Sequence, residues 1–209
     1  MPGPRFTGTL VRMTETRRST KRVLAVLERA TPDAIRGLQK ELELSKHTAA
    51  EIWGATAALL SAGLARLTRR RPNDSRAAIE AIRKHGRPAD VEAADVGIAG
   101  RLEKTRLSVR LGGILGEAGP RAALWLAERT GTEAGVVERA VAAAAPVALG
   151  AFDTALEPRE LGTWVAMLPD GALTRPERLL DANEEPAEIF RRLRRHGQSR
   201  IGRLLGLSG

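Results

Sequence analysis

Apolar residues three and four positions apart recur through nearly the whole chain, and this spacing restricts the fold more than any other feature. Between residues 52 and 67 they form one stripe on a helix of 3.6 residues per turn. No segment alternates apolar and polar residues with a period of two, as a half-buried strand would. The 209-residue chain is therefore predicted to be all-α, a multihelical single domain.

Capping residues, prolines and glycines predict where the helices begin and end. The predicted helix starts are Thr31-Pro32, Ser45, Pro120, Thr132 and Glu157-Pro158. The predicted helix ends are residues 70–74, Gly86 and Gly131. Residues 1–20 are rich in Thr, Arg and Pro, and we expect them to form a flexible basic arm.

Two stretches of the sequence resemble each other. Residues 38–64 and 124–151 each contain a short helical segment, a break with Ser or Thr, and a long segment of small residues. Setting Gly63 against Gly150, 87 positions apart, aligns the two. Repeats of this kind usually bury their apolar faces against each other. After the arm, we therefore predict two helical repeats, residues 21–102 and 103–209, packed as one domain.

Composition and apolar runs exclude several classes of protein. The chain has no cysteine, which rules out a disulfide scaffold, a cysteine-ligated zinc site and a thiol nucleophile. The most apolar run, residues 140–152, contains Pro146 and is shorter than the about 20 residues that span a membrane. We interpret it as a buried helix. The N-terminal residues lack the apolar core of a signal peptide, so we expect a cytoplasmic protein without a membrane partner.

Neither a metal site nor catalytic machinery is evident in the sequence. Its three histidines, His47, His85 and His196, have no helical i, i+4 pairing, and His85 and His196 each precede a glycine that is typical of a helix end. The glycine-rich residues 111–119 lack the Gly-Lys-Ser/Thr of a phosphate-binding loop. We therefore expect no cofactor and no enzymatic activity. The sequence leaves open whether a ligand binds near Gly112–Gly119.

Charge is segregated along the chain. Lys and Arg number 34 against 25 Asp and Glu, a net charge of +9. Residues 66–87 hold eight basic and two acidic side chains, residues 189–209 hold six arginines and no acid, and the first 30 residues hold seven basic and two acidic side chains. Residues 151–188 hold nine acidic side chains and three arginines. Basic blocks of this kind suit the phosphate backbone of nucleic acid.

The leading interpretation is a non-enzymatic protein that binds duplex DNA without sequence specificity, for instance in the nucleoid. Six aromatic residues are too few for a surface that stacks single-stranded bases. The alternative is a scaffold protein that self-associates as an oligomer, or binds another protein, through its basic and acidic faces. The candidate DNA-binding residues are Arg66, Arg69, Arg70, Arg71, Arg76, Arg191, Arg192, Arg194, Arg195, Arg200 and Arg203.

The middle of the chain resembles a known family. Gly113-Ile114-Leu115-Gly116, Thr130-Gly131 and the Ala145-Pro146 to Gly150 stretch are similar to motifs of the bacterial YidB-like family, with a match over about residues 36–180. The resemblance implies an all-helical domain and no established activity. The basic ends of this chain depart from that family.

A second, local resemblance supports the DNA-binding interpretation. Residues 44–77 are similar to the winged helix of MarR-type repressors, in which Leu-Ser-x-x-Thr opens the recognition helix. That resemblance implies that Ser45, Lys46, His47 and Thr48 face the DNA groove and that Arg70 and Arg71 contact the adjacent backbone. The internal duplication instead favours a plain pair of helices for the same residues.

Overall fold

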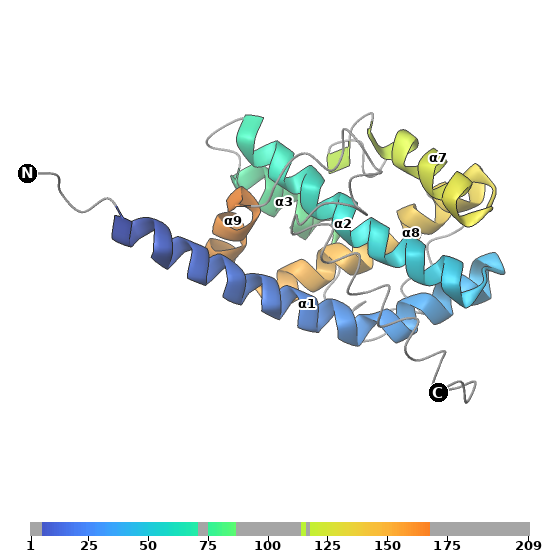
Figure 1. Ribbon diagram of the computed structural model, residues 1–209, viewed down its shortest axis with the longest axis horizontal. Helices are drawn as coiled ribbons and strands as arrows, with labels where there is room; N and C mark the ends of the chain where they lie inside the picture. Colours follow the sequence, from blue (N-terminus) through green and yellow to red (C-terminus); the bar gives the residue numbers. More distant parts are fainter. Residues whose placement is uncertain (1–5, 71–74, 87–113, 116–117, 168–209) are drawn as a thin grey trace, which may run out of the picture.

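The computed structural model describes residues 6–70, 75–86, 114–115 and 118–167 (Figure 1). These residues form six α-helices and, within the described ranges, no strand. The prediction of an all-α chain is confirmed. The helices enclose one buried apolar cluster, whose members run from Val23 to Trp164 and so come from both predicted repeats. Whether the chain arose by duplication stays a prediction.

The centre of the fold is α8, Ala134–Ala155. Every residue from 140 to 152 is buried, and α8 contacts each of the other five described helices. Small alanine side chains let these helices approach it closely. The interpretation of the apolar run as a buried helix is confirmed. By length and composition α8 is able to cross a membrane, but 78% of its most apolar window is buried inside the structure.

The longest helix is α1, Phe6–Leu42, which runs along one edge of the molecule in Figure 1. The prediction of a flexible arm over residues 1–20 is wrong for residues 6–20, which are helical. Ser19 and Thr20 are buried, because α9, Pro158–Met167, packs against this part of α1. Contact with α9 therefore fixes the C-terminal end of a stretch whose polar composition favoured a loose arm.

The predicted helix start at Thr31-Pro32 is also wrong, because α1 continues through Pro32. The Thr31 hydroxyl donates a hydrogen bond back to the carbonyl of Leu27, 2.7 Å away, instead of capping a new helix. The same hydroxyl accepts a hydrogen bond from the buried indole of Trp53. Proline disfavours a helix interior because it has no N–H to donate to the carbonyl four residues earlier. Pro32 is accommodated here beside Thr31, whose hydroxyl bonds to both Leu27 and Trp53.

The second helix, α2, extends over Lys46–Arg70. The prediction that Ser45 caps it is confirmed, since Ser45 Oγ accepts a hydrogen bond from the Thr48 amide at 3.1 Å. The helix continues through Gly54 without interruption. One 25-residue helix replaces the short recognition helix that the winged-helix resemblance implies, and no wing strand occurs among the described residues.

The third helix, α3, covers Ser75–His85 and ends before Gly86 as predicted. Gly86 lies directly against the backbone of α8. A Cβ atom at this position would be 2.9 Å from both the Gly150 nitrogen and the Leu149 carbonyl carbon. Glycine is therefore required here for close approach, and α3 is fixed against the central helix.

The break between α7, Ala118–Thr130, and α8 is a tight turn at Gly131. Gly131 has a φ of +64°, and the Thr132 amide donates to the Ala127 carbonyl at 3.1 Å, which is the Schellman pattern for a helix end. Glu133 occupies the N-cap of α8 without a side-chain cap hydrogen bond, so the predicted cap at Thr132 is wrong by one residue.

The corresponding break between α1 and α2 contains Glu43 with a φ of 54°. The ends of α1 and α7, Leu42 and Thr130, are 88 positions apart. The starts of α2 and α8, Lys46 and Ala134, are separated by the same number. This separation of 88 positions is one residue more than the 87 positions that separate Gly63 from Gly150. It places Ser45 opposite Glu133, which explains the misplaced cap.

Candidate nucleic-acid interface

None of the eleven arginines predicted to bind DNA has its side chain among the described parts of the structure. Arg66, Arg69 and Arg70 belong to the last turns of α2, and Arg76 to the first turn of α3. Only their backbone is described. Arg71 and the six arginines between positions 191 and 203 lie outside the described residues. Their role in binding DNA stays a prediction.

A basic surface that the sequence did not single out lies along α1. Six exposed cationic side chains form it, and we call them the basic stripe: Arg18, Lys21, Arg22, Arg29, Arg36 and Lys40. At 100° per residue all six fall within an arc of about 100°, and at 1.5 Å per residue they extend over about 33 Å of helix. The spacing was visible in the sequence. It was not recognised because the expected flexible arm and the expected helix break at Pro32 assigned these six residues to different segments.

The opposite face of α1 is held by two tryptophans. Trp164 of α9 donates its indole N–H to Thr20 Oγ1, and Trp53 of α2 donates to Thr31 Oγ1, each at 2.9 Å. Both tryptophans are fully buried. Positions 20 and 31 are separated by eleven residues, or about three turns, and therefore share one face of the helix. These two hydrogen bonds fix α1 to the core with the basic stripe directed outward.

Two cations of the basic stripe have carboxylate partners. Arg36 pairs with Asp33 at 2.9 Å on the same helix, and Arg22 Nη2 lies 2.6 Å from Glu160 Oε1 of α9. The hydrogen bond from Arg22 lowers the pKa of Glu160, and a second one from the Glu157 amide, 3.1 Å from Oε2, adds to this. No ion pair involves Arg18, Lys21, Arg29 or Lys40 within the described part of the chain.

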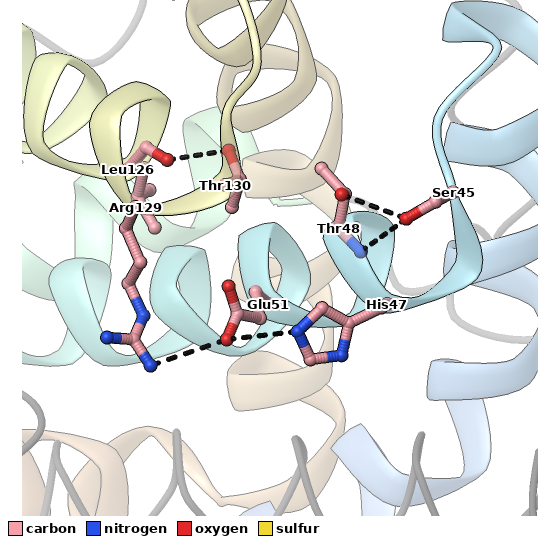
Figure 2. Close-up of polar contacts among 7 residues, drawn as sticks. All are labelled: Ser45, His47, Thr48, Glu51, Leu126, Arg129 and Thr130. Carbon is pink, nitrogen blue, oxygen red and sulfur yellow. Dashed lines mark hydrogen bonds and ion pairs between the residues drawn. The ribbon is translucent and has the colours of Figure 1, made fainter.

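A second polar cluster connects α2 with α7 (Figure 2). Glu51 Oε1 lies 3.4 Å from Arg129 Nη2 and 3.6 Å from His47 Nε2, while the Glu51 side chain is only 3% exposed. The Arg129 guanidinium also lies over the Trp125 ring, 5.7 Å from its centroid. This cluster was not evident from the sequence, because Glu51 and Arg129 are 78 positions apart.

The chemistry of this cluster is structural. Ser45, a hydroxyl two residues before His47, donates to Thr48 Oγ1 at 2.9 Å and serves the helix cap. Glu51 is a buried carboxylate whose charge is offset by an arginine of the other predicted repeat. His47, which the winged-helix resemblance placed in a DNA groove, lies one turn from Glu51 and is half exposed. The cluster therefore joins two helices.

Comparison with known proteins yields one family match. The family model described as "Bacterial protein of unknown function (DUF937)" matches residues 25–153. This range includes the C-terminal half of α1, all of α2, α3 and α7, and nearly all of α8. No curated protein matches the chain, and no solved structure matches it.

Proposed function

The chain belongs to the DUF937 family of bacterial proteins of unknown function, and we propose that it binds duplex DNA without sequence specificity and without catalysing a reaction. The resemblance to YidB-like proteins is compatible with this family. We propose in addition that the protein is cytoplasmic and acts in the nucleoid. No function of the family itself enters the proposal, which rests on the charge and geometry of α1.

The single observation that supports DNA binding is the basic stripe. Lysine and arginine side chains along one exposed face match a linear array of phosphates, and they release condensed counterions when they neutralise it. The helix is fixed in place before the partner arrives, because Trp53 and Trp164 hold its buried face. The ordering cost of binding is therefore confined to the long side chains themselves.

The basic stripe is tested by removing two of its arginines. We expect R18A/R29A to weaken binding to random-sequence duplex DNA, because each contact with a phosphate contributes about 0.9 to the slope of log K against log salt. The slope should become shallower by about 1.8. Fluorescence anisotropy at several salt concentrations measures it.

The matched control is R121A/R139A, which removes two exposed arginines of α7 and α8 and the same net charge. A slope that changes equally in both variants would mean that net charge alone acts and that the basic stripe is not the binding surface. A wild-type slope in R18A/R29A would also show that the basic stripe is not the binding surface.

Self-association is the second candidate function, and one observation favours it. Acidic residues near the end of α8 and in α9 pair with basic residues elsewhere in the molecule: Glu160 with Arg22, and Asp153 with Arg83 at 3.9 Å. The same attraction between copies would build an oligomer through basic and acidic faces. Light scattering across a salt series tests this, since salt would dissociate such an assembly. A monomer at every salt concentration would contradict it.

A further inference from the structure

We propose that Glu160 is a built-in competitor of the DNA phosphate, so that in the free protein it withholds Arg22 from the basic stripe. This inference rests on the proposed DNA binding and concerns its regulation. The contact is autoinhibitory, because a carboxylate of the protein occupies the guanidinium that a phosphate would otherwise bind.

The geometry of Glu160 supports this role. Its two oxygens have separate partners, with Oε1 on Arg22 and Oε2 on the amide of Glu157. The second bond is half of a capping box at the start of α9, and it orients the carboxylate before any partner binds. Glu160 is therefore held beside the basic stripe by its own helix.

Exchange of partners at Arg22 is open to a ligand from solvent. The side chains of Arg22 and Glu160 are 42% and 41% exposed. Exposed pairs of this kind contribute at most about 1 kcal/mol, so a phosphate is able to displace the carboxylate. The helix that carries Glu160 need not leave α1, since the buried hydrogen bond between Trp164 and Thr20 is separate from the ion pair.

The pair between Asp33 and Arg36 differs in kind. Its partners are three residues apart on the same helix, so it forms wherever α1 is helical. The pair between Arg22 and Glu160 spans 138 positions and forms only when α9 is packed on α1. Availability of Arg22 to DNA therefore depends on the packing of α9.

The test compares two substitutions that change the net charge equally. E160Q removes the competitor, and glutamine still satisfies the capping box. E157Q is the control, because Glu157 is exposed, lies in the same turn and has no ion pair within the described residues. We expect E160Q to tighten binding to a random-sequence duplex by up to about fivefold, the upper limit for an exposed ion pair, because phosphate no longer has to displace the carboxylate. We expect E157Q to leave the affinity unchanged.

A third variant fixes the assignment to Arg22. In an R22A background, E160Q should no longer alter the affinity for the duplex. The proposal is overturned if E160Q and E157Q behave alike, or if the effect of E160Q persists in the R22A background. In either case DNA binding itself stands provided that the wild-type protein binds and R18A/R29A weakens it. Absence of wild-type binding overturns both. Cooperative thermal unfolding of every variant establishes that each is folded.

Discussion

Two threonines and two tryptophans show how single residues set the course of α1. Thr20 and Thr31 are buried polar residues on an apolar face, and each accepts the indole N–H of a buried tryptophan. A buried N–H without an acceptor is costly. These hydrogen bonds therefore hold the helix at two points, and they explain why neither the polar N-terminal composition nor Pro32 interrupts it.

Replacing Thr31 tests this account at the residue scale. T31V keeps the shape of the side chain and removes the acceptor of Trp53, so we expect the free energy of unfolding to fall by about 1–3 kcal/mol. Urea denaturation followed by circular dichroism measures the change.

The matched control is T163V, because Thr163 is exposed and makes only a local hydrogen bond to the Arg159 carbonyl. That variant should differ from the wild type by less than about 0.5 kcal/mol. Equal losses in the two variants would show that the pairing of Trp53 with Thr31 contributes nothing beyond the substitution itself.

At the scale of the elements, the fold depends on close approach to α8. Its small side chains let the five other described helices pack around it. Gly86 brings the end of α3 against its backbone at Leu149 and Gly150. Between residues 140 and 152 a helix that is surrounded in this way has no exposed face. This arrangement accounts for a segment whose composition alone would also suit a membrane span.

Adding one methyl group at Gly86 tests this contact. We expect G86A to lower the free energy of unfolding by about 1–3 kcal/mol, the usual cost of overpacking, because the new Cβ meets backbone atoms that cannot yield easily. Thermal or urea unfolding measures it.

The comparison variant is G135A in the first turn of α8, where a new Cβ would meet only the flexible Glu133 carboxylate at 3.5 Å. Alanine favours the helix by about 0.5–1 kcal/mol over glycine, so this variant should be at least as stable as the wild type. A stable G86A protein would show that α3 does not require glycine at this contact.

At the scale of the whole molecule, local signals predicted some features correctly and long-range contacts decided others. The all-α class, the Ser45 cap and the end of α3 were evident from the sequence because each depends on residues close along the chain. The continuity of α1 was not, since it depends on Trp53 and Trp164, which are distant in sequence from their threonine partners.

The candidate site follows the same division. Segregated charge was readable from the sequence, and the basic block of the first 30 residues contributes four members of the basic stripe. Their shared face became evident only when α1 proved to be one helix. The pairing of Arg22 with Glu160 could not be predicted from the sequence, because the two residues are 138 positions apart. The predicted arginines of residues 66–76 and 191–203 stay candidates that binding experiments must judge.

The central claim is that the basic surface of this protein binds duplex DNA, and a salt titration of the wild-type protein tests it most directly. Anisotropy with a random-sequence duplex between about 50 and 200 mM salt measures both the affinity and its salt dependence. If the four cations of the basic stripe that form no ion pair within the described residues contact phosphates, the slope of log K against log salt is at least about 3.6 in magnitude. Binding that is micromolar or tighter at the low-salt end and that falls with this slope is the predicted result. No binding at the lowest salt concentration, or an affinity that salt does not change, would contradict the account.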